Sequence, residues 1–289
     1  MGFQIALPTL GTDNERYYLD LLEGSETWLQ RKLARSGLAR YEPETLATLL
    51  ALVGTGQSKA VFLDVGAHFG LYAAVLERVS GARLAAVHAF EPTPDTFAIG
   101  GRIREANGLY VGYHCLALSN ANGEGQLYLS NTSDVTNSLV PGFRRARKEL
   151  TVQTMRIDDL VVQLDVAPSI LKIDVESHEV PVLEGALRTV ERHKPSLVVE
   201  VLERHHDAFL STRVWQSVLE LGYVFYHINP AVPWRNGRRN ELYPRSRDLL
   251  LVPKRLDRDF WLQYISWRYA ISHCTSRRHR HVEFNVSKS

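Results

Sequence analysis

Val61-Phe62-Leu63-Asp64-Val65-Gly66-Ala67-His68-Phe69-Gly70 is the stretch that decides the fold of this chain. An apolar run with a carboxylate near its end leads directly into a loop whose glycines, Gly66 and Gly70, are four residues apart. A helical pattern from Leu71 to Val79 follows the loop. Such a short, nearly continuous apolar run is typical of a strand buried on both faces of a parallel sheet. The stretch therefore predicts a strand, a tight turn and a helix.

Three further apolar runs also end in an acid, and helical patterns separate them. The runs are 85–91, 170–174 and 197–200, and the helical patterns are 96–105, 180–192 and 208–221. This alternation predicts a doubly wound, mostly parallel α/β sheet. Ligands of such sheets bind at the carboxyl ends of the strands. We therefore expect the four terminal acids to gather at one rim of the sheet, namely Asp64, Glu91, Asp174 and Glu200.

The remaining segments set the predicted domain boundaries. We expect a helical N-terminal extension over 1–58, the sheet domain over 59–254, and a C-terminal helix with a basic tail over 255–289. Within the sheet domain, extended segments are expected at 125–129 and 150–154, as an excursion over the rim, and at 223–228 and 248–252, where the sheet ends.

Composition excludes several classes of protein. Of the 289 residues 45% are hydrophobic and 23% are charged, which is ordinary for a globular chain. A net charge of +2 gives no field that favours a nucleic acid partner. Two cysteines, Cys115 and Cys274, cannot build a disulfide framework. Neither a signal peptide nor a transmembrane run is visible, so we expect a cytoplasmic protein.

The C-terminal segment contains aromatic and apolar side chains at helical spacing. Positions 260, 264, 267 and 271 share one helix face, which we expect to pack on the sheet domain. A dimer contact or a membrane-surface helix are the alternatives, and the sequence does not indicate the oligomeric state. The basic tail with Arg277, Arg278 and Arg280 could contact anionic lipid, although such charge runs are usually only solvated.

The loop after the first strand indicates which cofactor the rim would bind. A dinucleotide loop needs G-x-G-x-x-G, and the spacing of Gly66 and Gly70 does not provide it. The carboxylate of Asp64 before the loop would repel a pyrophosphate but suits an ammonium group. Glu91, at the end of the next strand, is placed to accept hydrogen bonds from ribose hydroxyls. S-adenosylmethionine, which has an ammonium, a sulfonium and a ribose but no phosphate, fits these features.

These residues resemble the motifs of the FkbM family of methyltransferases. The resembling stretches are 61–70, Ala89-Phe90-Glu91-Pro92, Leu116-Ala117-Leu118-Ser119, 155–160, 171–179, 182–186 and 195–200. The resemblance implies a class I, S-adenosylmethionine-dependent fold in which 248–252 forms an antiparallel last strand. It also implies O-methylation of sugars or natural products. Two positions depart from the family pattern: His68 stands where Asn is usual, and Ser177 where Gly is usual.

Site residues follow from the motifs and from their positions after the strands. The expected cofactor-binding residues are Asp64, Gly66, His68, Gly70, Glu91, Ala117 and Asp174. Methyl transfer to a hydroxyl also needs a general base. Asp174, His178 and Glu200 are the expected catalytic residues, with His178 as the base because its ordinary pKa lies closest to neutrality. Glu179 could belong to the same catalytic turn or could only stabilise the start of the helix. Lys172 is charged in a strand that we expect to be buried, so it needs a partner of opposite charge.

The predicted function is an S-adenosylmethionine-dependent O-methyltransferase that acts on a sugar, glycolipid or natural product. The partner is then a small-molecule or glycan acceptor. Carboxylates and imidazoles at the rim could also hold Mg²⁺ or Mn²⁺, but no spacing is diagnostic, so no metal is predicted. The alternatives are a non-catalytic binding protein with the same cofactor pocket and, less favoured, a nicotinamide-dependent oxidoreductase.

Overall fold

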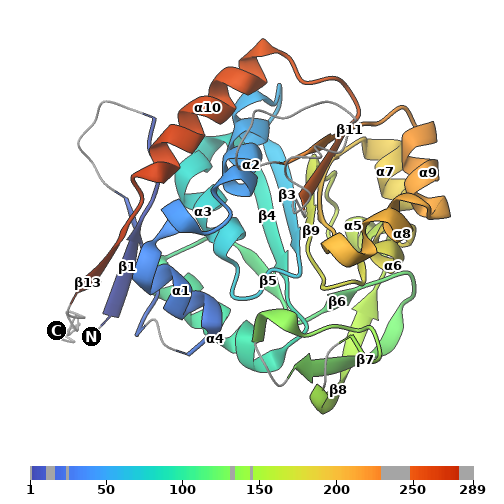
Figure 1. Cartoon of the computed structure of the whole chain (residues 1–289), viewed down its shortest axis with the longest axis horizontal. Coiled ribbons are helices and arrows are strands. Elements are labelled where there is room, and N and C mark those ends of the chain that lie inside the picture. The colour runs from blue at the N-terminus through green and yellow to red at the C-terminus, as the bar shows by residue number, and fades with distance from the viewer. Residues whose placement is uncertain are drawn as a thin grey trace.

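A central sheet of seven strands forms the middle of the protein (Figure 1). The structure is a computed structural model, and it describes residues 2–10, 17–23, 26–130, 134–143, 146–228 and 248–279. Its order is β11-β12-β10-β9-β3-β4-β5. The bounds are β3 (Ala60–Val65), β4 (Leu84–Phe90), β5 (Gly112–His114), β9 (Ile170–Ile173), β10 (Ser196–Glu200), β11 (Val224–His227) and β12 (Asp248–Val252).

Strand direction in this sheet confirms the predicted mostly parallel, doubly wound architecture. Five strands from β10 to β5 are paired in parallel. β12 lies between β10 and β11 and is antiparallel to both. This is the place and direction that the class I methyltransferase resemblance implied for residues 248–252.

Helices cover both faces of the sheet because alternate strand residues point to opposite sides. Phe62 of β3 belongs to one buried cluster, whereas its neighbours Val61 and Leu63 belong to the other. The first cluster contains residues of α2 (Pro43–Thr55), α3 (Leu71–Ser80), α4 (Pro94–Asn107) and α10 (Arg258–Ser272). The second contains residues of α5 (Ile157–Gln163), α6 (Glu179–Glu184), α7 (Leu187–His193), α8 (His206–Leu210) and α9 (Arg213–Glu220).

Two helices that we predicted as continuous are each broken in two. The expected helix 180–192 is α6 and α7, because the chain at Gly185 passes so close to Ser119 that a Cβ would lie 2.0 Å from its carbonyl oxygen. The expected helix 208–221 is α8 and α9. Thr212 starts α9 by accepting a hydrogen bond from the backbone N–H of Trp215, which is the behaviour of an N-cap.

A second small sheet forms the predicted excursion of the middle segment. Its order is β6 (Ala117–Leu118), β8 (Ala146–Met155) and β7 (Gly123–Ser130), and β7 and β8 are antiparallel. A short 3-10 helix, η3 (Asp134–Thr136), follows β7. Residues 131–133 and 144–145 of this excursion lie outside the described residues.

The prediction that residues 1–58 are helical is wrong for the first part of the segment. β1 (Gly2–Ala6) and β2 (Tyr18–Asp20) precede α1 (Trp28–Ser36) and α2. β1 pairs with β2 and with β13 (Ser276–His279), so it is held as a strand by a partner that is distant in sequence. The C-terminal segment is therefore a helix followed by a strand, and residues 280–289 lie outside the described residues.

α10 packs against the domain through the face that its spacing indicated. Phe260, Tyr264 and Ile271 are buried, and α10 lies along α2 (Figure 1). Leu262, Ile265 and Tyr269 remain exposed. Among the described residues, no helix combines the length and the apolar character needed to cross a bilayer.

Truncation before Ser276 should destabilise the protein without emptying its site. The deletion removes the β1–β13 ladder and the hydrogen bond from Ser276 Oγ to Ala34 O, which is 2.6 Å long. At about 0.5–1.5 kcal/mol per hydrogen bond, we expect a loss of about 2–4 kcal/mol in the free energy of unfolding, measured by denaturant unfolding. Calorimetry should show unchanged binding of S-adenosylmethionine. A folded truncation variant that no longer bound it would place the site away from the central sheet.

Candidate functional site

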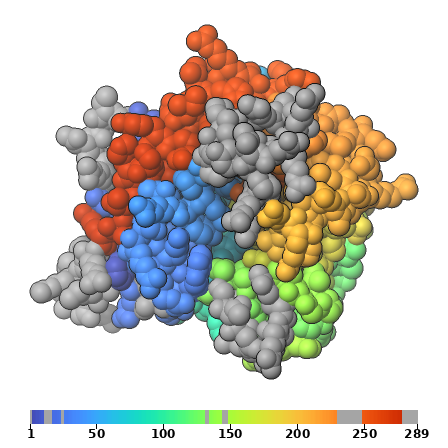
Figure 2. Space-filling model, in the orientation of Figure 1, coloured from blue at the N-terminus to red at the C-terminus, as the bar shows by residue number. Residues whose placement is uncertain are grey.

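A cavity lies at the carboxyl ends of β3, β4, β9 and β10. Gly66, Glu91, Asp174 and Glu200, which follow or end these strands, line it. The other walls come from Trp28 of α1, from Tyr41 and Glu42 before α2, and from residues of β6, β7 and η3. Figure 2 shows the face on which the N-terminal segment (blue), the middle excursion (green) and the segment that follows β10 (golden) meet around a hollow.

Gly66 makes the sharp turn that forms the floor of the cavity. Its φ is +78°, and a Cβ at this position would lie 1.8 Å from the carbonyl oxygen of Asp174. The backbone N–H of Asp174 in turn donates to Val65 O at 3.0 Å. The ends of β3 and β9 are therefore in direct backbone contact, which a side chain at residue 66 would prevent.

Glu91 organises the loop as well as lining the cavity. Its Oε2 accepts a hydrogen bond from the backbone N–H of His68 at 3.0 Å, and its Oε1 accepts one from Thr93 at 2.8 Å. Each carboxylate oxygen has a second lone pair. The side chain can therefore hold the loop in place and still accept hydrogen bonds from a ligand.

His68 connects the loop to the middle excursion. It has a positive φ of 53°, and its Nε2 lies 3.2 Å from Oδ2 of Asp134 in η3. The backbone N–H of Trp28 also donates to Asp134, at 3.0 Å. Burial by itself raises the pKa of Asp134, but the hydrogen bond and charge of His68 outweigh it, so this pKa is lowered. One carboxylate thus joins the loop after β3, the excursion and α1.

Lys172 is a buried cation surrounded by carboxylates. Its side chain is 5% exposed, and its Nζ lies 2.8 Å from Oδ2 of Asp174. The same ammonium lies 4.7 Å from the centre of the Tyr72 ring, and the hydroxyl of Tyr72 donates to Glu42. Burial lowers the pKa of Lys172, but Asp174, Asp64 and Glu42 outweigh burial and raise it above its ordinary value. The amine is therefore charged, as the need for a partner predicted.

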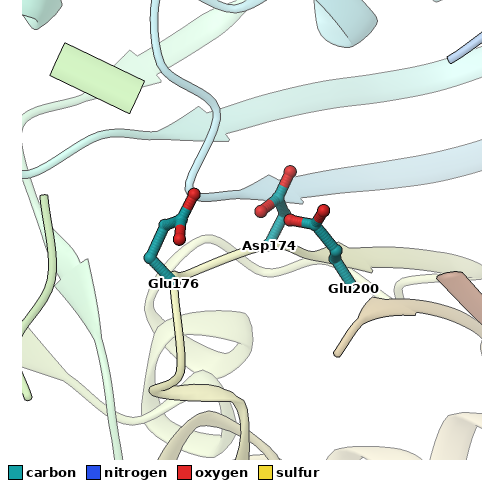
Figure 3. Close-up of side chains that lie close together, drawn as sticks. All are labelled: Asp174, Glu176 and Glu200. Carbon is teal, nitrogen blue, oxygen red and sulfur yellow. The ribbon is translucent and has the colours of Figure 1, made fainter. Parts of the chain in front are cut away.

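Three carboxylates converge on the cavity beside Lys172. Oxygen atoms of Asp174, Glu176 and Glu200 lie within 4.8 Å of one another, and Figure 3 shows the three side chains pointing to the same side of the strand ends. Burial, the charge of Asp174 and a hydrogen bond with Asp174 raise the pKa of Glu200 well above its ordinary value. Asp174 and Glu200 therefore form a pair that holds a proton between them.

Six of the predicted site residues line this one cavity. They are Gly66, His68, Glu91, Ala117, Asp174 and Glu200. The three others do not: Gly70 begins α3 with a φ of +83°, Asp64 is fully buried, and His178 lies at the start of α6. The rim thus assembles largely as the strand ends predicted.

Asp64 lies beneath the cavity wall because it is a residue of β3 itself and not of the loop. Its Oδ2 accepts from the backbone N–H of Ala73 at 3.3 Å, while its Oδ1 has no hydrogen-bond partner among the described residues. Burial raises its pKa to about 6, even though Lys172 acts in the opposite direction. Its role here is to hold the first turn of α3 and to face the Lys172 charge.

His178 and Glu179 both have local partners. Nε2 of His178 lies 2.9 Å from Oγ of Ser119, and burial lowers the His178 pKa to about 4. Glu179 accepts from the backbone N–H of Ser177 at 2.9 Å, and burial raises its pKa to about 7. His178 is thus neutral near pH 7 but is engaged away from the cavity wall.

Sequence reasoning missed the wall that comes from the N-terminal segment. Trp28, Tyr41 and Glu42 of this segment line the cavity, beside Tyr72 of α3. Glu42 precedes the proline that starts α2 and has a left-handed backbone, with φ 40°. An acid before a proline is too common a pattern to indicate a site, and we had interpreted the segment as an extension. Burial, together with Asp248 and Asp174, raises the Glu42 pKa to about 7.

A comparison with protein families shows which family the chain belongs to. The model described as the methyltransferase FkbM domain matches residues 64–225, more than half of the 289-residue chain. The chain belongs to the FkbM family of methyltransferase domains. The match includes the loop after β3 and every predicted site residue, whereas the wall from α1 and from the residues before α2 lies outside it.

Individual relatives are more distant. Hexuronic acid methyltransferase AglP of Haloferax volcanii is 28% identical over 170 residues, which are 57% of this chain and 62% of that protein, so the chain spans less than two thirds of its length. The solved FkbM methyltransferase of Methylobacillus flagellatus KT is 20% identical, covers 73% of this chain and 50% of its own, and has a TM-score of 0.48. Fibrillarin of Aeropyrum pernix, solved with natively bound S-adenosyl-L-methionine, is 12% identical, with 86% and 88% covered and a TM-score of 0.44.

Asp64→Asn should change how stability depends on pH. The folded protein raises the Asp64 pKa from about 3.8 to about 6, so the folded state keeps this proton longer than the unfolded chain does. As the pH rises from about 4 to 6, the unfolded chain releases this proton before the folded protein does, so the free energy of unfolding decreases, and above about pH 6 it decreases no further. Asn has no such proton, so the free energy of unfolding of the variant should not show this decrease. Between pH 4 and 7 the variant should therefore gain about 2–3 kcal/mol relative to wild type. Urea unfolding at several pH values measures it, and parallel curves for the two proteins would contradict the assignment.

Proposed function

We propose that this chain is an S-adenosylmethionine-dependent O-methyltransferase that transfers a methyl group to a hydroxyl of a sugar or a glycosylated metabolite. The observation that carries the proposal is the convergence, in one cavity, of the Gly66 turn, Glu91 and the Asp174–Glu200 pair. The family membership supports methyl transfer. The hexuronic acid methyltransferase supports a sugar acceptor.

The residues at one end of the cavity fit S-adenosylmethionine. Glu91 offers carboxylate oxygens to the ribose hydroxyls, and the Gly66 turn forms part of the same wall. A wall rich in carboxylates suits a cofactor that carries an ammonium and a sulfonium and has no phosphate. The loop also lacks the glycine spacing that a dinucleotide needs.

When bound, the cofactor supplies a methyl group on a positively charged sulfur. The task of the protein is to hold the acceptor oxygen in line with that methyl group and to remove the proton of the hydroxyl. Groups on the wall that can hold a hydroxyl in position include Asp134, Asn137 and Glu176. Asn137 is itself fixed, because its Nδ2 donates to Thr93 Oγ1 at 3.3 Å and its Oδ1 accepts from Ser130 N at 2.9 Å.

The Asp174–Glu200 pair is the best placed base. Both side chains line the cavity, and Lys172 holds Asp174 in position through a 2.8 Å contact. The pair shares one proton and still has an ionised oxygen, so it can take the proton of the acceptor hydroxyl. His178, which we predicted as the base, has its Nε2 on Ser119. We assign it a positioning role next to β6.

Glu91→Ala should weaken binding of S-adenosylmethionine by about 1–3 kcal/mol, because hydrogen bonds to a charged acceptor are lost. Calorimetry measures this, with Glu105→Ala, an exposed position on α4, as the matched control. NAD should not bind to any of these proteins. Tight NAD binding by the wild type, with no response to S-adenosylmethionine or its demethylated product, would refute the proposed function.

Glu200→Gln and Asp174→Asn should each lower turnover by about 100- to 10,000-fold, the usual contribution of general base catalysis. Affinity for S-adenosylmethionine should change much less in Glu200→Gln, and exposed Glu203→Gln is the control. His178→Ala should lower turnover by less than about 10-fold. Labelled methyl transfer to a panel of sugars, followed by mass spectrometry, measures turnover. If His178→Ala instead lost 100-fold or more with unchanged cofactor affinity, the base would be His178, as the sequence predicted.

A further inference from the structure

We propose that the acceptor carries an ammonium group, as an amino sugar does, and that the cavity disfavours an acceptor with a carboxylate. This inference rests on the proposed function and names the substrate class for the same cavity. The charge of the acceptor would then differ from that of the relative whose name gives hexuronic acid as its substrate.

The charges on the cavity wall are unbalanced. Six carboxylate side chains line it, and they come from five segments, of which the turn after β9 contributes two: Glu42, Glu91, Asp134, Asp174, Glu176 and Glu200. Among the described lining residues, the groups that can be cationic are Lys172 and His68. The acids therefore outnumber the bases by four. An acceptor that carries a carboxylate would therefore be repelled by the negative potential of the cavity wall.

Both wall cations are engaged with acids of the wall. The Lys172 ammonium contacts Asp174 and lies over the ring of Tyr72. Nε2 of His68 contacts Asp134. A sugar carboxylate would have to displace one of these contacts and leave a buried or half-buried acid without its partner, which is costly. The described wall therefore offers an acidic acceptor no unengaged cation.

Protons and the cofactor neutralise only part of the excess. The pKa values of Glu42 and Glu200 are raised, so these two groups tend to keep their protons near neutral pH. The four other acids of the wall face Lys172, His68 and the single net positive charge of S-adenosylmethionine. These acids outnumber the three cations by one. A single ammonium on the acceptor would make up this difference.

The carboxylates beside Lys172 have a spacing that suits an ammonium group. Three hydrogen-bond acceptors about 2.8 Å from one ammonium nitrogen lie roughly 4.6 Å apart. The oxygens of Asp174, Glu176 and Glu200 lie within 4.8 Å of one another at the edge of the cavity, which is close enough for one ammonium group to contact all three (Figure 3). An amine bound there would place a neighbouring sugar hydroxyl beside the Asp174–Glu200 pair that takes its proton.

The test compares three monosaccharides that differ in charge: glucosamine, glucose and glucuronic acid. Calorimetry measures their binding to the full chain saturated with S-adenosylhomocysteine. We expect glucosamine to bind at least 10-fold more tightly than glucose, and glucuronic acid more weakly than glucose. The advantage of glucosamine should shrink as the salt concentration rises. Glu176→Gln should reduce that advantage to about 3-fold or less, whereas Glu149→Gln, exposed on β8 and outside the cavity wall, should leave it unchanged.

Other outcomes would contradict either this inference or the proposed function. Equal binding of the three sugars, tighter binding of glucuronic acid, or no binding of glucosamine at millimolar concentration would overturn the inference while leaving the proposed function standing. An amine preference that survives in Glu176→Gln would also overturn it, as would one that appears only with added Mg²⁺ and disappears with EDTA. Failure of S-adenosylhomocysteine itself to bind would instead refute the proposed function.

Discussion

The site depends on one buried cation. Lys172 is in β9 at the centre of the sheet, and its ammonium lies close to Asp174, Asp64 and Glu42. Without it, those carboxyls would be buried together with nothing to offset their repulsion. Removing one partner of a buried ion pair costs about 3–5 kcal/mol. Lys172 therefore allows the fold to keep a set of acids next to the cavity.

The acids near Lys172 differ in how readily they lose their protons. Asp174, in direct contact with Lys172, is stabilised in its ionised form, whereas the pKa values of Glu42, Asp64 and Glu200 are raised by burial. The cavity thus has carboxylates beside carboxylic acids within one network. The proposed methyl transfer needs both forms, because the cofactor is positively charged and the acceptor hydroxyl has to lose a proton.

Backbone geometry explains why the strand ends could be predicted and some side chains could not. Glu91, Asp174 and Glu200 line the cavity because each follows or ends a parallel strand, and this register is visible in the pattern of apolar runs. Asp64 has the same pattern, but β3 continues to Val65, so its side chain stays below the rim. A difference of one residue in the length of a strand therefore decides whether its acid lines the cavity or is buried below it. The pattern of apolar residues does not fix the end of a strand to within one residue.

Contacts between distant segments account for the other differences. β1 is a strand because β13, more than 270 residues later, pairs with it, and no local pattern indicates such a partner. The helix predicted over 180–192 breaks at Gly185 because Ser119 lies against it. The same residue, Ser119, engages Nε2 of His178 away from the cavity wall. In each case a tertiary contact overrides a local preference that the sequence does contain.

The division between the family domain and its additions bears on specificity. Residues that suit a cofactor, Gly66 and Glu91, lie within the matched region 64–225, as does the Asp174–Glu200 pair. Trp28, Tyr41 and Glu42 precede that region, yet they line the same cavity. Their positions are fixed by contacts into the domain: Trp28 N–H donates to Asp134, and Glu42 accepts from Tyr72. Because this wall is bonded to the site but lies outside the matched region, substitutions in it can alter the fit of an acceptor without touching the residues proposed to carry out methyl transfer.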